Sequence, residues 1–97
     1  MDFETFRNST EAEAPPKGLG LAVQALWWDA KGDWDQAHKL ADSRHDQAGS
    51  WVHAYLHRKE GDRGNARYWY GRAGKAMPAK ASFDEEWRAI ARELLAG

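Results

Sequence analysis

The sequence contains the same Gly-Asp pair twice, 29 positions apart, at Gly32-Asp33 and Gly61-Asp62. Apolar residues with a 3.6-residue period precede the first pair, which indicates an amphipathic helix that ends there, and the same arrangement returns before the second. Glycine adopts the left-handed conformation that terminates a helix, and aspartate is a good N-cap for the next one. Each pair therefore predicts a tight reversal between two antiparallel helices.

The two copies agree beyond the turn. A shift of 29 positions also matches Val23 with Val52 and Ala37 with Ala66. A small alanine suits close packing of the second helix of a hairpin, so the match has a physical reason. The sequence predicts an all-α fold with two hairpins, made of segments 19–30 and 34–43 and of segments 51–60 and 65–73, with a polar turn at 43–49.

A last helix is predicted to begin at Ser82. Its hydroxyl and the Glu85 side chain have the spacing of a capping box. Apolar residues then recur on one face of the segment, at Phe83, Trp87, Ile90, Ala91, Leu94 and Leu95. Because the end of a helical stack leaves its core open, this segment is expected to act as a C-terminal capping helix.

The first 18 residues differ in composition from the rest. They mix Glu, Ser, Thr and Asn with the pair Pro15-Pro16, which predicts a mobile arm over 1–18 and a single helical domain over 19–97. Docking of the arm through Phe3 and Phe6 is the alternative, since exposed aromatic side chains are costly.

Charge and composition exclude several classes of function. Fourteen Lys and Arg residues against fifteen Asp and Glu give no basic footprint for nucleic acid or acidic membranes. With no Cys, the chain has no disulfide, thiolate ligand or cysteine nucleophile. The acidic start and the lack of a long apolar run predict a cytoplasmic protein, and no cofactor is expected.

The second hairpin resembles a tetratricopeptide repeat. The resemblance rests on Gly61-Asp62, Ala66, Tyr70, Ala73 and Pro78, whose spacing matches the second helix of that repeat and its closing proline. The first hairpin is a degenerate copy. The longer string from residue 51 to residue 70 also resembles a widespread group of small bacterial and fungal proteins without a known activity.

The tetratricopeptide resemblance implies a binding role. Such proteins bind extended peptides in a groove lined by the first helices, and the matching positions here are Trp51, Tyr55, Arg58 and Lys59. These residues share one side of a helix and combine two aromatic faces with two cations, which suits a carboxylate or phosphate with an apolar neighbour. The alternative is that the aromatic side chains pack in the core and the cations are solvated.

His53 and His57 are spaced i, i+4 and occupy positions that are apolar in the repeat pattern, with Glu60 one turn later. Two imidazoles at this spacing can share a metal ion, but the segment specifies no third ligand, so no metal site is predicted. A polar site, or histidines hydrogen-bonded within the core, are the other interpretations. His38 and His45 join them only if the two hairpins pack suitably.

Three consecutive aromatic residues, Tyr68, Trp69 and Tyr70, spread over about 300° of a helix, so they cannot all face one core. Tyr70 fits the packing position of the repeat, which leaves Tyr68 or Trp69 for an exposed contact. The sequence thus favours a module that binds a protein or peptide, with a homodimer left open. The alternative is a small enzyme or small-molecule-binding protein with a histidine-containing polar pocket.

Overall fold

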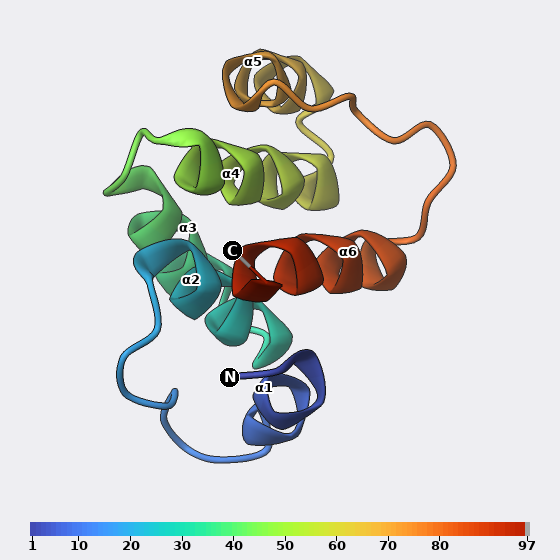
Figure 1. The fold of residues 1–97 in the computed structure, drawn as a ribbon. Coiled ribbons are helices and arrows are strands. Elements are labelled where there is room, and N and C mark those ends of the chain that lie inside the picture. The colour runs from blue at the N-terminus through green and yellow to red at the C-terminus, as the bar shows by residue number, and fades with distance from the viewer. Residues whose placement is uncertain (97) are drawn as a thin grey trace.

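The computed structural model describes residues 1–96, which fold into six α-helices without a strand (Figure 1). In chain order they are α1 (Phe3–Ser9), α2 (Leu21–Ala30), α3 (Trp34–Asp42), α4 (Gln47–Glu60), α5 (Arg63–Ala73) and α6 (Phe83–Ala96). The predicted all-α class is confirmed. Within the described residues, none of these helices has the length and apolar character needed to span a bilayer.

Both Gly-Asp pairs form the predicted turns. Gly32 and Gly61 have φ angles of +85° and +93°, in the left-handed region that favours glycine. The side chain of each aspartate accepts a hydrogen bond from the backbone N–H three residues later, at 3.0 Å for Asp33 and 3.2 Å for Asp62. The turns place α3 beside α2 and α5 beside α4 (Figure 1).

Helix α4 begins earlier than its apolar pattern indicates. Asp46 is its N-cap and accepts a hydrogen bond from the Gly49 N–H at 2.8 Å, so residues 47–49 form the first helical turn and are not part of a polar turn. A Cβ atom at position 49 would lie 2.1 Å from the Arg44 carbonyl oxygen. Glycine is therefore required where the start of α4 crosses the chain leaving α3.

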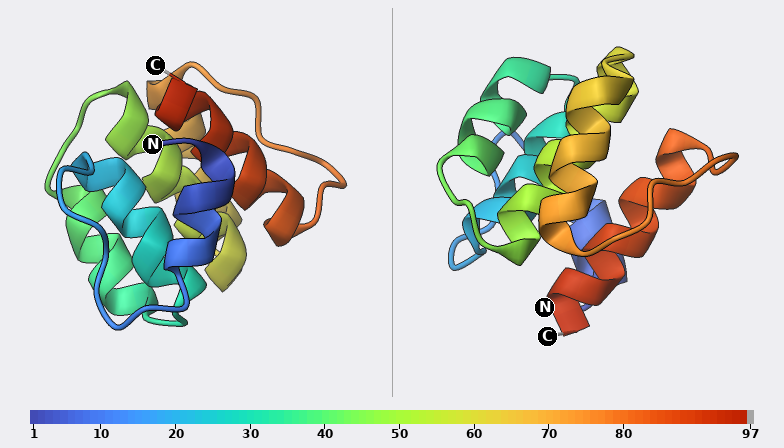
Figure 2. Two further views of the ribbon diagram at one scale, coloured as in Figure 1. Left: turned by 60° about the horizontal axis from the view of Figure 1, so that its bottom comes forward. Right: turned by 90° about the horizontal axis from the view of Figure 1, so that it is seen from above.

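Helix α6 has the predicted capping box but an unexpected position. The Ser82 hydroxyl accepts from the Glu85 N–H at 3.0 Å, and the Glu85 carboxylate accepts from the Ser82 N–H at 3.4 Å. The helix lies across α2 and α4, where the Trp87 indole donates to the Leu26 carbonyl oxygen at 2.9 Å (Figures 1 and 2). It thus covers the face that the first helices of the two pairs share.

Residues 3–9, within the predicted arm, form a helix that docks on the body, as the alternative based on Phe3 and Phe6 expects. Figure 2 shows α1 alongside α6. Phe6 has no exposed surface and stacks on Trp87 with a ring-centre distance of 5.7 Å, while Phe3 meets the same indole edge-on at 6.0 Å. Two aromatic residues at i, i+3 thus give α1 an apolar face, despite the polar composition around them.

Helix α4 is the centre of the molecule, since α2, α3, α5 and α6 all pack against it. Its Val52, Tyr55 and Leu56 side chains are at most 1% exposed. One face of α4 meets α2 and α6, whereas the other meets α3 and α5. The functional candidates on α4 are therefore divided between two different environments.

We expect the substitution Phe6→Ala to lower the free energy of unfolding by about 3–5 kcal/mol, because it removes a fully buried ring from the contact between α1 and α6. Urea denaturation followed by tryptophan fluorescence measures this. The control is Tyr68→Ala, which truncates an aromatic side chain that is 56% exposed and is expected to change stability by less than about 0.5 kcal/mol. Equal stability of the two variants would show that α1 is not part of the fold.

Candidate functional site

Most of the side chains expected to bind a ligand lie on α4, and the remaining two lie on α5. The structure separates them by face. The side of α4 toward α6 carries Trp51, Tyr55, Arg58 and Lys59. The side toward α3 and α5 carries His53 and His57. Tyr68 and Trp69 lie on α5, where Trp69 stacks on His53. Glu60 ends the helix next to His57.

Arg58 is neutralised by a buried carboxylate. Its guanidinium donates to Glu86 Oε1 at 2.8 Å and also contacts the Ala81 carbonyl oxygen, while the Tyr70 hydroxyl donates to the second Glu86 oxygen. Glu86 is only 5% exposed, and this burial raises the pKa of its carboxyl group. Arg58 thus links α4 to α6 and is not available as an open cationic site.

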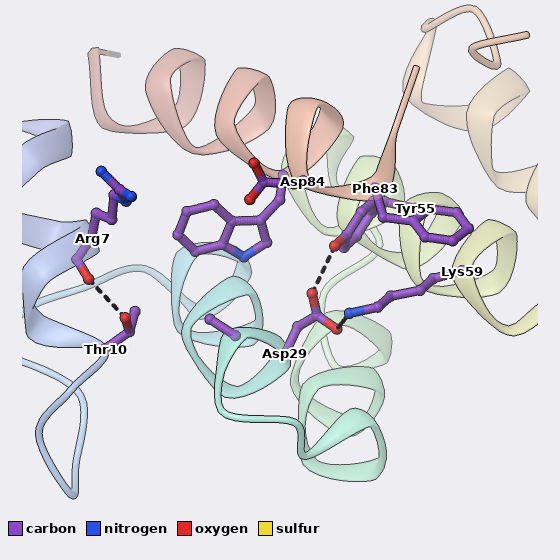
Figure 3. Close-up of a pocket in the computed structure, with 9 residues that line it drawn as sticks. Arg7, Thr10, Asp29, Tyr55, Lys59, Phe83 and Asp84 are labelled. Atoms are coloured by element: carbon purple, nitrogen blue, oxygen red, sulfur yellow. Dashed lines mark hydrogen bonds and ion pairs between the residues drawn. The ribbon is translucent and has the colours of Figure 1, made fainter. Parts of the chain in front are cut away.

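Tyr55 and Lys59 converge on one carboxylate of α2, as Figure 3 shows. Asp29 accepts from the Tyr55 hydroxyl at 2.7 Å and from Lys59 Nζ at 3.0 Å. Burial and the adjacent Asp29 charge raise the pKa of Tyr55, which keeps the phenol protonated as a donor. A cleft of about 310 Å³ lies beside this group, and Arg7 and Thr10 approach it from the α1 side.

The four residues expected to line a peptide groove therefore do not form one open patch. Tyr55 is buried, and Arg58 and Lys59 have carboxylate partners within the chain. Trp51 is half-buried, with cavities of about 270 and 330 Å³ beside it between α4 and α6. Lys75 Nζ lies 4.3 Å from the centre of its ring.

The opposite face of α4 gathers three imidazoles. His38 reaches it from α3, and its Nε2 atom lies 3.0 Å from Nε2 of His53. The His57 ring centre is 4.8 Å from that of His53 and 5.1 Å from that of His38. Aromatic rings enclose the group, since Trp34 stacks on His38 at 4.8 Å and Trp69 stacks on His53 at 4.1 Å.

Burial controls the protonation of His53 within this cluster. His53 is 3% exposed, and desolvation, together with the neighbouring His38 and His57, lowers the pKa of His53 to about 4. His57 Nδ1 lies 2.6 Å from the Glu60 carboxylate. His53 Nδ1 is buried without a hydrogen-bond partner, and the nearest carboxylate oxygen of Asp42 is 3.8 Å away.

The structure adds residues that sequence reasoning did not place in a site. The sequence pattern makes His38 only a conditional neighbour of His53 and His57, and it does not single out Trp34 or Asp29. Trp34 and His38 are spaced i, i+4 on α3, and this spacing predicts that their side chains are neighbours on one face of the helix. The Trp34 indole donates to the Leu56 carbonyl oxygen at 3.0 Å and so fixes α3 against α4. On α5, Tyr68 is exposed and Trp69 is half-buried.

Comparisons of the chain with protein-family models, with curated proteins and with solved structures find no match. The tetratricopeptide resemblance therefore stays a prediction that rests on the residues of the second hairpin.

Replacement of Tyr55 by Phe is expected to lower the free energy of unfolding by about 1.5–3 kcal/mol, because Asp29 loses a buried donor to its charged group. Urea denaturation of the variant measures the loss. Tyr68→Phe is the matched control, since the hydroxyl it removes is on an exposed side chain. If both variants unfold at the same urea concentration as the wild type, the hydrogen bond to Asp29 does not hold α4 against α2.

Proposed function

We propose that the protein is a binding module that takes a short peptide into the groove between α4 and α6, with Trp51 at its centre. The observation that supports this is the pair of cavities that Trp51 lines, whose other walls combine apolar side chains with carboxylates. Those walls include Ala48, Leu94, Ala76, Pro78, Ala81 and Ala89. A groove of this kind admits small apolar side chains next to an aromatic ring.

The chain's own lysine indicates the chemistry of the ligand. Lys75 lies at 4.3 Å over the Trp51 ring, and the same Nζ atom is 3.0 Å from a carboxylate oxygen of Glu93 on α6. A cation is thus held between an aromatic face and a carboxylate. The same two groups would receive a lysine or arginine of a bound peptide once the Lys75 side chain swings away.

This geometry reverses the sign of charge expected for the ligand. The expectation of a carboxylate or phosphate depended on Arg58 and Lys59, both of which are paired within the chain. Between its apolar residues, the groove beside Trp51 carries carboxylates, among them Glu85 and Glu93. A peptide with a basic residue next to small apolar residues therefore complements it better than an acidic peptide.

Fluorescence anisotropy with a panel of labelled peptides tests the proposal. Peptides with a central Lys or Arg flanked by Ala, Leu or Pro should bind, whereas the same peptides with Glu at the centre should not. Trp51→Ala should weaken binding by roughly 2- to 30-fold, which corresponds to the loss of a cation–π contact worth about 0.5–2 kcal/mol. Lys75→Ala should tighten binding, since it removes the internal competitor.

Two substitutions on surfaces away from the groove serve as controls. Lys39→Ala on α3 matches the change at Lys75, and Tyr68→Ala on α5 matches the loss of an aromatic side chain. Neither should alter the affinity. Equal binding by wild type and Trp51→Ala, or stronger binding of the acidic peptides, would refute the proposal.

A further inference from the structure

The three imidazoles on the far face of α4 lie close enough together to share one ion. One ring nitrogen from each of His38, His53 and His57 lies within 4.8 Å of the others. A tetrahedral zinc ion with Zn–N distances of about 2.0–2.1 Å holds its nitrogens roughly 3.3 Å apart. The pair at 3.0 Å is already near that spacing, and small side-chain rotations bring in the third nitrogen.

Hydrogen bonding within the chain leaves this cluster incomplete. The Nε2 atoms of His38 and His53 face each other, and only one proton fits between them. One of these nitrogens therefore donates its N–H, and the other accepts with its lone pair. His53 Nδ1 is a buried polar atom without a partner, which is costly. The hydrogen bonds among the three imidazoles therefore do not satisfy all of their ring nitrogens.

Carboxylates stand behind two of the rings, as they do around metal-bound histidines. The contact of His57 Nδ1 with Glu60 at 2.6 Å favours the tautomer that leaves Nε2 as the ligand atom. Asp42, at 3.8 Å from His53 Nδ1, is placed to accept a hydrogen bond from that nitrogen after a small movement. Such outer carboxylates orient imidazoles and raise their basicity as ligands.

The geometry points to a site for a divalent transition-metal ion of the zinc class, bound by His38, His53 and His57, with an exchangeable water as the fourth ligand. A set of neutral imidazoles selects Zn²⁺, Co²⁺, Ni²⁺ or Cu²⁺ over Mg²⁺ and Ca²⁺, which prefer oxygen ligands. The ion links α3 to α4 and so joins the first helix pair to the second. This site is independent of the peptide groove, because the two lie on different faces of α4.

Isothermal titration of tag-free protein with ZnCl₂ tests the site, with MgCl₂ as the comparison. One equivalent of Zn²⁺ should bind and raise the thermal unfolding temperature, whereas Mg²⁺ should do neither. Glu60→Gln removes the carboxylate behind His57 and should weaken zinc binding by roughly 10- to 100-fold. Each of His38→Gln, His53→Gln and His57→Gln removes a ligand and should weaken zinc binding by at least as much.

The chain provides a matched control. His45 is an exposed histidine on the loop between α3 and α4, and its Nε2 lies 3.5 Å from the Asp42 oxygen that faces His53 Nδ1. His45→Gln should therefore leave the stoichiometry unchanged and weaken zinc binding far less than His38→Gln. The Co²⁺ complex of the wild type should also show the visible absorption of a tetrahedral site, and His38→Gln should abolish it. His38 is only half-buried, so that variant tests the site even where His53→Gln fails to fold.

Two results would overturn the inference. One is the absence of stoichiometric zinc binding by folded wild-type protein, and the other is an equal loss of binding in His45→Gln and His38→Gln. Trp51→Ala should bind zinc like the wild type, and His38→Gln should bind the basic peptide like the wild type. Failure of the metal site is thus distinguishable from failure of the peptide groove.

Discussion

Burial of the middle of α4 is the constraint on which the rest of the structure depends. Four other helices pack against it, so each polar side chain it carries needs a partner inside the protein. Toward α2 and α6 the partners are carboxylates, with Arg58 bonded to Glu86 and Lys59 to Asp29. Toward α3 and α5 the histidines have mainly one another, which leaves His53 Nδ1 unpaired.

The position of α6 determines which of these faces can bind a ligand. By packing on α2 and α4, it covers the surface that the first helices of the two pairs share. On that side, open space remains in the strip beside Trp51 and in the cleft beside Tyr55 and Asp29. Because α6 covers most of this face, the ligand we propose is short and its contacts centre on the Trp51 ring.

Local features of the fold follow from the sequence, because they depend on neighbouring residues. The turns at Gly32 and Gly61 and the capping box at Ser82 all form as predicted. Contacts between distant segments were not predictable in the same way. The docking of Phe6 on Trp87 and the approach of His38 to His53 depend on how whole helices pack, and periodicity gives the face of a helix but not its neighbour.

The same distinction explains the outcome for the candidate site. The i, i+4 spacing placed His53 and His57 on one face of a helix, but the third imidazole comes from another helix. The pattern at Arg58 and Lys59 indicated cations without showing that Glu86 and Asp29 would neutralise them. Long side chains that look exposed from periodicity alone can pair with a buried charge, and only the tertiary structure reveals that pairing.

The most direct test of this account is native-state hydrogen exchange of the amides in α6 compared with those in α4. If α6 is an integral layer that closes one face of α4, amides at 87–91 should open with the same free energy as amides at 52–57, in a single cooperative unit. Exchange in α6 that is much faster than in α4, with α4 still protected, would contradict the account. It would show that the face lined by Tyr55 and Arg58 opens to solvent without unfolding of the core.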